Sequence, residues 1–476
     1  MLHKTSRKVP VQAVLAHAAE RRWSEVIAAT ADVEALAGQP MLLPLRIEAA
    51  LEDGNDEEVR RTIDVVERAT LRAELRFAAV RPLLKFARPA DAWRVLSADG
   101  SITGHHRYIQ QVRKVLAYSH SEPELVSAIQ AALDALLGEA VEPSPSDYSF
   151  RDDPARRNRP MGEVRIVAST EVEPRHVEGL SVARDRFRRR LSKPAAPSVC
   201  EYHDVFVDPT GQIWTEDGSI IVTTGRPIAH TSREACRQLD VALPALRGTR
   251  GIYHWVVDLL PHLSLLGPEP DIPVLIGAHG PRFERESLAL AGIADEQVIA
   301  ISEVVFVRRL VVPSVGMAGL RHWQATGGIF ERVAARAGEM AAANGFACPE
   351  KVYISRRDST RRRLLNEEEL EGALQQRGYA VVLMSTMPLW QQIALASGVR
   401  SIVAPHGAGL SHLMFCRGDT RVLELLPIMD GSYTLRFNYA RLALALGYDY
   451  TAWLEPQLAR SDHWRVCIDE LPESLL

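Results

Sequence analysis

Short runs of β-branched and aliphatic residues alternate with helix-length stretches from residue 163 onward, and this alternation restricts the fold more than any other feature. Strands that alternate with helices build parallel sheets whose faces are both covered by helices. We predict strands at residues 164–168, 220–223, 273–276, 304–312, 352–355, 380–383, 402–404 and 422–425. An α/β fold follows from this pattern.

Residues 163–476 are too many for a single mononucleotide-binding unit, so we expect two α/β layers with a cleft between them. The division falls near residues 332–348, where a polar, Ala-rich helix precedes a new strand. The two predicted layers therefore cover residues 163–340 and 341–476.

Residues 1–138 show a different pattern, in which Ala-rich amphipathic stretches follow one another with short breaks. Similar segments begin at Trp23, Asp56, Ala90 and Pro123, and each precedes or opens a helical pattern. Their spacing of 33 or 34 residues resembles that of tetratricopeptide-type helical hairpins, but the full signature of that repeat is absent. An irregular helical bundle is the alternative. In either case we expect this region to make contacts and not to carry out chemistry.

Residues 139–162 join the two regions. They are rich in proline, serine and charged residues and contain few apolar ones. Such a composition predicts a linker with too little apolar content to pack.

The composition excludes several classes of protein. The net charge of −4, without a long run of one sign, argues against a nucleic-acid partner, although residues 186–190 form a local basic cluster. The five cysteines include no Cys-x-x-Cys pair, so neither a zinc cage nor a disulfide framework is indicated. No apolar run approaches the roughly 18 residues that cross a bilayer, and no signal peptide is evident. We expect a cytoplasmic protein that works near a membrane.

The first motif with chemical meaning is a glycine-containing turn at His406, Gly407, Ala408 and Gly409. A buried strand precedes the turn, and a helix is predicted to begin near Leu410. Glycines let backbone amides approach a ligand closely, and a helix N-terminus adds partial positive charge, so a diphosphate would fit here. The alternative is an ordinary strand-to-helix turn in which His406 is satisfied locally.

The second motif follows the strand predicted at residues 352–355 and begins with Arg356 and Arg357. Guanidinium groups match phosphate oxygens in two-pronged geometry, and ligands of open α/β sheets bind at the carboxyl ends of strands. A solvated charged loop is the better interpretation for residues 361–363. Asn366 is predicted to cap a helix that begins with glutamates.

The third motif contains His254 and Asp258, which share one face of a helix because they are four residues apart. An imidazole that a carboxylate orients is a suitable general base. The alternative is a helix whose Trp255 faces the core and whose polar neighbours are incidental.

Several common phosphate-binding motifs are absent from the sequence. There is no Asp-x-Asp triplet, no Gly-x-x-x-x-Gly-Lys loop and no Gly-x-Gly-x-x-Gly fingerprint. A departing diphosphate would therefore be stabilised by arginines and a helix dipole, without a metal or other cofactor.

Taken in order, the three motifs, the Gln392-Ile393 pair and Glu424 resemble the family-61 glycosyltransferases over roughly residues 160–456. The resemblance implies two Rossmann-like lobes of the GT-B type, with the acceptor side in residues 163–340 and the nucleotide-sugar side in 341–476. It also implies inverting transfer without a metal. The chain looks most like bacterial members linked to surface polysaccharides. His412, Gln391 and His262 depart from the family pattern, which weakens any transfer of donor or acceptor specificity.

For this reaction we hypothesise a role for each motif. His254, oriented by Asp258, would accept the proton of the acceptor hydroxyl, or Asp258 would act directly. The donor would be held by Arg356, Arg357, His406 and the amides of residues 407–409, and Glu424 would bind ribose hydroxyls or serve the structure. The expected partners are a nucleotide sugar, a hydroxyl of a glycan, lipid-linked or protein acceptor, and a protein that binds the N-terminal helices.

The sequence also bears on three other functions. A non-catalytic carbohydrate- or partner-binding protein with a degenerate transferase fold suits the repeat-like N-terminus. A phosphatase with His406 as nucleophile would need an arginine where Pro405 stands. The missing phosphate loop disfavours a nucleotide-dependent kinase.

Overall fold

The computed structural model describes residues 10–20, 22–246, 248, 251–266, 272–428, 437–458 and 462–473. The chain divides into two compact units. The helical unit comprises Met1–Val141 and Asp217–His230, and the α/β unit comprises Glu142–Glu216 and Thr231–Leu476. The short segment 217–230, which contains strand β5 (Ile220–Val222), is thus grouped with the helices.

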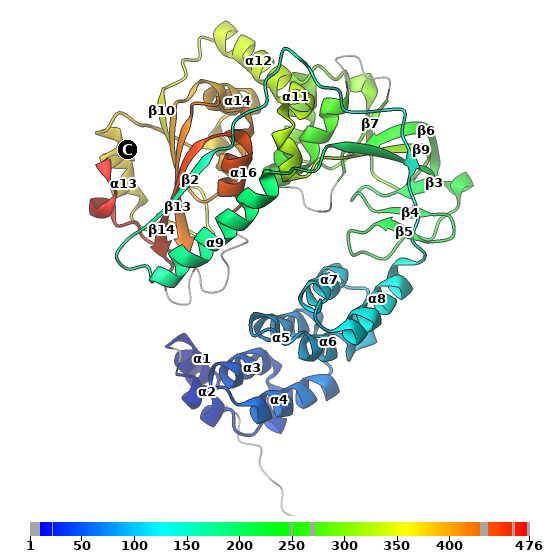
Figure 1. Cartoon of the computed structure of the whole chain (residues 1–476), viewed down its shortest axis with the longest axis vertical. Helices are drawn as coiled ribbons and strands as arrows, with labels where there is room; N and C mark the ends of the chain where they lie inside the picture. Colours follow the sequence, from blue (N-terminus) through cyan, green and yellow to red (C-terminus); the bar gives the residue numbers. More distant parts are fainter. Residues whose placement is uncertain are drawn as a thin grey trace, which may run out of the picture. The chain divides into compact units, whose positions relative to one another are not determined.

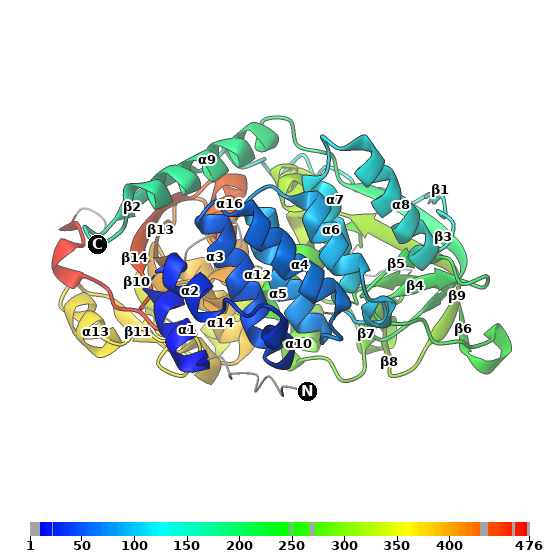
Figure 2. The ribbon, with the colours of Figure 1, turned by 90° about the horizontal axis from the view of Figure 1, so that it is seen from below.

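The described residues of the helical unit are mostly α-helical, as Figure 1 shows. The α-helices in these residues are α1 (Val11–Ala19), α2 (Trp23–Ala29), α3 (Leu43–Glu52), α4 (Asp56–Arg68), α5 (Ala73–Lys85), α6 (Pro89–Ser97), α7 (Tyr108–Tyr118) and α8 (Pro123–Leu137). Every second helix begins at or one residue before a segment of the 33-to-34-residue period, which therefore marks real helix starts. Figure 2 shows successive helices lying side by side, and α3 packs against both α4 and α5.

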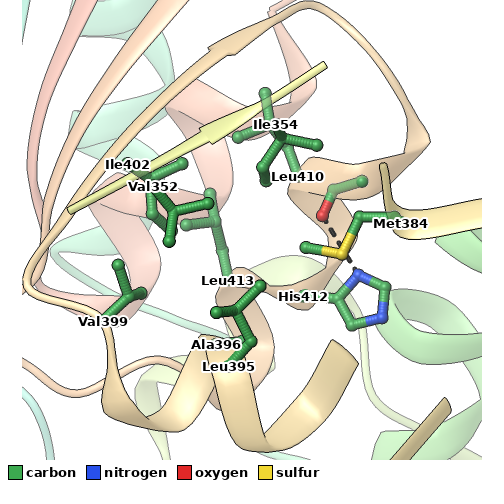
Figure 3. Close-up of a pocket in the computed structure, with 11 residues that line it drawn as sticks. Val352, Ile354, Met384, Leu395, Ala396, Val399, Ile402, Leu410, His412 and Leu413 are labelled. Carbon is green, nitrogen blue, oxygen red and sulfur yellow. Dashed lines mark hydrogen bonds between the residues drawn. The ribbon is translucent and has the colours of Figure 1, made fainter. Parts of the chain in front are cut away.

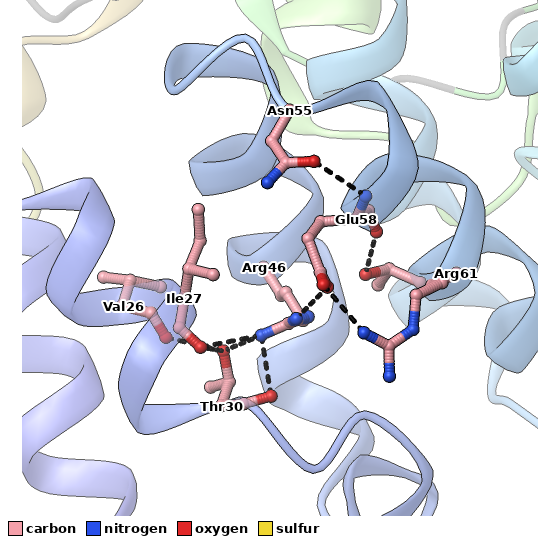
Figure 4. A network of polar contacts seen from close by, with 8 residues as sticks. Val26, Ile27, Thr30, Arg46, Asn55, Glu58 and Arg61 are labelled. Atoms are coloured by element: carbon pink, nitrogen blue, oxygen red, sulfur yellow. Dashed lines mark hydrogen bonds and ion pairs between the residues drawn. The ribbon is translucent and has the colours of Figure 1, made fainter.

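A buried arginine ties three of these helices together (Figure 4). Arg46 on α3 is 1% exposed, and its Nη1 donates to the carbonyl oxygens of Ile27 (2.9 Å) and Thr30 (2.7 Å). Its Nη2 donates to the carboxylate of Glu58 on α4. Burial alone would raise the pKa of Glu58, but the hydrogen bond and charge of Arg46, with those of Arg61, hold that pKa below its ordinary value. Arg46 thus satisfies carbonyl oxygens at the C-terminal end of α2 and, through Glu58, also holds α4.

The larger sheet of the α/β unit is mixed. Its strands are β1 (Ser144–Pro145), β3 (Ser198–Val207), β4 (Ile213–Thr215), β6 (Arg237–Pro244), β7 (Val274–Gly277), β8 (Val298–Ile301) and β9 (Val305–Ser314). They lie in the order β4-β3-β9-β6-β7-β8, and β1 pairs with β3. Strands β9, β6, β7 and β8 are parallel, whereas β3 is antiparallel to both β9 and β4.

The expectation of wholly parallel sheets is therefore wrong for this layer. The physical reason lies in β3, where polar residues such as Glu201 and His203 interrupt the apolar ones. Such a mixture is typical of antiparallel strands, and it escapes a search for continuous apolar runs. For the same reason β3 was absent from the predicted strands.

The second sheet is entirely parallel, in the order β11-β10-β12-β13-β14-β2. Its strands are β2 (Glu163–Ala168), β10 (Lys351–Ile354), β11 (Ala380–Val382), β12 (Ser401–Pro405), β13 (Arg421–Ile428) and β14 (Asp449–Pro456). Strand β2 opens the segment 163–340 and yet pairs with β14 near the end of the chain. The chain thus enters the second sheet before it builds the first.

Helices cover both faces of this parallel sheet. The α-helices in the described residues of this unit are α9 (Pro174–Leu191), α10 (Arg282–Leu290), α11 (Trp323–Thr326), α12 (Gly328–Ala343), α13 (Glu367–Gln375), α14 (Leu389–Gly398) and α16 (Asn438–Leu446). Figure 1 shows α13 on one side of the sheet and α14 and α16 on the other. Side chains of successive strand residues accordingly enter different cores, as Tyr353 does on one side and Val352 and Ile354 do on the other.

One apolar core runs without interruption between the two sheets. It joins Val274 and Val311 of the mixed sheet to Ile402 and Val422 of the parallel sheet through helices α12 and α14. Both layers therefore share a packed interior. Within residues 139–162, Tyr148, Phe150 and Met161 are partly buried against this core, although the composition of that segment predicted too little apolar content to pack.

No helix in the described part of the chain has the length and apolar character needed to cross a membrane.

The buried arginine generates a test of the helical unit. Replacing Arg46 with Ala leaves Glu58 without its buried cation, so we expect Arg46→Ala to lower the free energy of unfolding by about 3 kcal/mol. Arg61 is the matched control because it pairs with the same carboxylate but is 53% exposed, and Arg61→Ala should cost less than about 1 kcal/mol. Urea unfolding followed by far-UV circular dichroism measures both values. Equal losses in the two variants would contradict the account.

Candidate functional site

A cavity of about 530 Å³ opens at the carboxyl-terminal edge of the parallel sheet. The loop that follows β10 and the turn that follows β12 form its walls, with Met384 and Ser385 after β11. These strands are neighbours in the sheet, so their carboxyl ends meet at one edge. Open α/β sheets bind ligands at such an edge.

Arg356 forms one wall of the cavity. Its Nη2 donates to Ser359 Oγ (2.9 Å) and to the carbonyl oxygen of Arg361 (3.3 Å). Burial, followed by the charge of Arg362, lowers the pKa of the Arg356 guanidinium, although an arginine still remains charged. Within the described residues its buried Nε has no hydrogen-bond partner. The guanidinium is therefore held in place while part of its hydrogen-bonding capacity is unused.

Gly407 lies directly against that guanidinium. A Cβ atom added at Gly407 would stand 1.8 Å from Nη1 of Arg356, far inside any real contact distance. The requirement for glycine is purely steric here, because its backbone is extended, with φ at −179°. The sequence predicted a turn at the glycines and an arginine at the end of a strand. These two features are in contact in the structure.

Glu367 fixes the backbone from which Arg356 projects. Its buried carboxylate accepts hydrogen bonds from the backbone N–H of Arg356 (2.6 Å), from the hydroxyl of Tyr353 (2.9 Å) and from Ser355 Oγ (3.3 Å). Glu367 opens helix α13 and so anchors the loop to it. The sequence showed Glu367 only as a favourable residue for a helix start, and nothing in it indicated these contacts.

The prediction that Asn366 caps this helix with its side chain is wrong. The Asn366 side chain makes no capping hydrogen bond. Instead its amide donates to the carbonyl oxygen of Val466 (2.8 Å) and accepts from the N–H of the same residue (3.1 Å). This two-point pairing with the C-terminal segment uses the same polar groups that a cap would need.

The turn itself leads into a 3-10 helix, Ala408–Phe415, slightly earlier than the helix start predicted near Leu410. Gly407, Ala408, Gly409 and Leu410 line the cavity. Gly409 approaches Ile354 so closely that an added Cβ would lie 2.9 Å from its side chain. The small residues of the turn therefore let its backbone lie close to the end of β10.

His406 and Glu424 form a buried pair behind the turn. His406 Nδ1 lies 2.6 Å from Oε1 of Glu424, and the hydroxyl of Tyr450 donates to Oε2. Glu424 is wholly inaccessible to solvent. Burial raises its pKa, and the charge and hydrogen bond of His406 oppose that increase.

This geometry does not support the expectation that Glu424 binds ribose hydroxyls. Both carboxylate oxygens already accept hydrogen bonds from within the protein, and no part of the side chain reaches solvent. Glu424 also lies in the middle of β13, and a further strand, β14, follows it in the sequence. The contacts with His406 and Tyr450 instead favour the structural role that the sequence also left open for Glu424.

Arg357 is not brought to the cavity. Its Nε lies 3.2 Å from Oε1 of the buried Glu371, on the side of α13. Arg361 and Arg362, interpreted from the sequence as a solvated loop, line the cavity instead. Arg357 lies in a turn beyond the end of β10, and its pairing with Glu371 on α13 separates it from Arg356.

His254 and Asp258 meet as their spacing predicted. Nδ1 of His254 lies 2.7 Å from Oδ2 of Asp258, within a single π-helical turn, His254–Leu259. The 3-10 helix Leu260–Leu265 continues this segment. The His254 side chain is 39% exposed, so the ring is oriented by the carboxylate and still accessible to a ligand. An accessible imidazole held in this way can accept a proton.

Two tyrosines connect this pair to the turn. The ring centroids of His254 and Tyr253 are 5.3 Å apart, those of Tyr253 and Tyr439 are 5.6 Å apart, and those of Tyr439 and His406 are 5.5 Å apart. Tyr439 is supplied by α16, far from the other three in sequence. The two histidine–carboxylate pairs thus belong to one aromatic cluster, which sequence motifs alone did not reveal.

A second, small apolar pocket lies beside the cavity (Figure 3). His412 projects into it and is fully buried, and its Nδ1 lies 3.0 Å from the carbonyl oxygen of Gly409. Burial lowers the pKa of His412 to about 4, so the ring is neutral near pH 7. Met384 lies between this pocket and the cavity and is held by Gln392, whose amide donates to the carbonyl oxygens of Met384 (2.9 Å) and Met387 (2.8 Å).

Residues 252–423 match the family model Glycosyltransferase 61. The match includes His254, Asp258, Arg356 and the 406–409 turn, and it ends one residue before Glu424. It supports family 61 and, in general terms, glycosyltransferase activity with a nucleotide-sugar donor and a glycan acceptor. No curated protein matches the chain.

The contact between Gly407 and Arg356 can be tested directly. A methyl group at Gly407 must displace the guanidinium, so we expect Gly407→Ala to weaken the binding of inorganic pyrophosphate by at least about tenfold. Gly418→Ala is the matched control, because a Cβ there meets no atom within 4 Å. Isothermal titration calorimetry measures both affinities, and thermal melting checks that each variant is folded. Wild-type affinity in Gly407→Ala would refute the placement of Arg356.

Proposed function

We propose that the chain is an inverting glycosyltransferase that moves a sugar from a nucleotide-sugar donor to a hydroxyl acceptor. The placement of Arg356 against Gly407, in a cavity at the carboxyl edge of a parallel sheet, supports this proposal most directly. The family match over residues 252–423 supports the reaction class. Surface polysaccharide or glycoconjugate synthesis is the pathway we propose.

The donor diphosphate lies between Arg356 and the amides of residues 407–409 in this proposal. Arg361 and Arg362 add positive charge to the same cavity. Guanidinium groups and backbone amides stabilise the negative charge that develops on a leaving diphosphate, because they are already oriented when the sugar departs. Arg357, which pairs with Glu371, has no part in it.

His254 is the proposed general base, with Asp258 as the group that orients it. The acceptor hydroxyl gives its proton to His254 as it attacks the anomeric carbon from the face opposite the diphosphate. An exposed imidazole beside a carboxylate at 2.7 Å supports this assignment. Direct action of Asp258 is the alternative, and it predicts that His254 is dispensable.

We also propose that transfer requires no metal ion. In the described lining of the cavity, Asp358 is the one carboxylate, whereas Arg356, Arg361 and Arg362 supply three cations. A divalent cation bound to a diphosphate needs oxygen ligands from the protein, and this lining is poor in them.

The finer architecture and the location are likewise proposals. The two sheets correspond to two Rossmann-like lobes of the GT-B type, with the parallel sheet on the donor side. The helical unit, with helix starts every 33 or 34 residues, is proposed to be tetratricopeptide-like and to bind a partner protein. All five cysteines are unpaired, which fits a cytoplasmic protein.

A donor screen by thermal shift tests the donor site. The wild-type protein should be stabilised selectively by one nucleotide sugar, equally with magnesium and with a chelator. Arg356→Ala should remove that stabilisation, whereas Arg357→Ala, its neighbour in sequence, should retain it. A donor shift that survives in Arg356→Ala, or one that needs magnesium, would contradict the proposal.

The same donor then tests the base. His254→Ala should keep the donor-induced stabilisation and lose turnover by about a hundredfold or more, measured as acceptor-dependent release of the nucleotide. Undiminished turnover in this variant would exclude His254 as the base.

A further inference from the structure

Glu424 is a buried carboxylate and, in the described part of the chain, His406 is its one hydrogen-bonded candidate for a cationic partner. It is fully enclosed, and Tyr450 and His406 each supply one hydrogen-bond donor to it. Tyr450 contributes no charge, so an ionised Glu424 depends first on His406 for compensation and then on the charge of Arg362. Because a buried charge is costly without such a partner, the protonation states of the two side chains are linked.

The groups around His406 oppose one another. Glu424 on β13 places negative charge beside the ring, while the positive charge of Arg356 lies against the adjacent Gly407 and that of Arg362 acts on Glu424. Tyr439 on α16 lies against the ring and remains neutral, because burial raises its pKa. Tyr450 on β14 reaches the histidine only through Glu424. In the ligand-free protein the arginines therefore oppose part of the effect of the carboxylate.

A diphosphate in the cavity would change the balance of positive and negative charge around His406. It neutralises the guanidinium groups and adds negative charge beside the turn that His406 begins. Nδ1 of His406 is engaged with Glu424, so Nε2 is the ring nitrogen that remains to donate to an anion. His406 is not itself part of the cavity lining, but it directly precedes Gly407, which is. A neutral ring with its proton on Nδ1 would present a lone pair there, which repels phosphate oxygen.

We propose that His406 takes up a proton from solvent at Nε2 when a diphosphate binds, and that Glu424 is the positioning residue that makes this possible. The proposal rests on the assignment of the diphosphate to this cavity. The imidazolium then donates a charge-assisted hydrogen bond to a phosphate oxygen, while Glu424 accepts from Nδ1. The sequence left open whether Glu424 binds ribose hydroxyls or serves the structure, whereas in this proposal it acts through His406.

Proton uptake on binding is directly measurable. Titration calorimetry with UDP, GDP and ADP, in buffers of different ionisation enthalpy at about pH 8, gives the number of protons exchanged. We expect the wild-type protein to take up close to one proton with the nucleotide that binds best. Glu424→Gln keeps the shape of the side chain but removes its charge, so it should abolish the uptake and weaken binding by about tenfold.

Two further variants separate charge from structure. Tyr450→Phe keeps the charge of Glu424, so proton uptake should persist. Glu455→Gln is the matched control: Glu455 is also buried in the parallel sheet, but its hydrogen-bond partners Ser169, Trp453 and the N–H of Cys467 are neutral. That variant should behave as the wild type.

The outcomes distinguish this inference from the proposed function. If no nucleoside diphosphate binds, the donor site itself is wrong. If one binds without proton uptake, or if Glu424→Gln takes up as many protons as the wild type, the donor site stands and the role of Glu424 is overturned. The wild-type measurement decides the question even if Glu424→Gln fails to fold.

Discussion

The contact between the Arg356 guanidinium and the backbone of Gly407 is the constraint on which the rest of the site depends. It exists because β10 and β12 are adjacent parallel strands, so the loop after one and the turn after the other leave the sheet at the same edge. Glu367 then fixes the backbone of Arg356, and the missing side chain of Gly407 makes room for its guanidinium. Positive charge and backbone amides consequently converge on one cavity, where a diphosphate can be held.

The two histidine–carboxylate pairs differ in environment, and this difference suits them to different tasks. His254 and Asp258 are partly exposed, so the imidazole can exchange protons with an incoming hydroxyl. Glu424 is completely enclosed, and its influence reaches the cavity only through His406. Tyr253 and Tyr439 pack the two pairs into one cluster.

Much of the site follows from local sequence patterns, whereas its surroundings do not. The spacing of His254 and Asp258 and the position of Arg356 after a strand are local features, so the sequence predicted them. In the register of β13 and β14, Tyr450 lies opposite Val422, two residues before Glu424, so Glu424 and Tyr450 are diagonal neighbours on one face of the sheet. A motif does not reveal the register of two strands. Arg357 points away because it lies in a turn beyond β10 and pairs with Glu371 on α13, a contact between segments that a motif does not show. The antiparallel pairing of β3 with β9 joins segments far apart in the chain, which local patterns do not specify.

The central claim is that the diphosphate of a nucleotide donor is bound between Arg356 and the 407–409 turn. The most direct measurement is an experimental structure of the protein with a bound nucleoside diphosphate. The account predicts phosphate oxygens within hydrogen-bonding distance of the Arg356 guanidinium and of at least one amide of the turn. A diphosphate bound elsewhere, with this cavity empty, would contradict it.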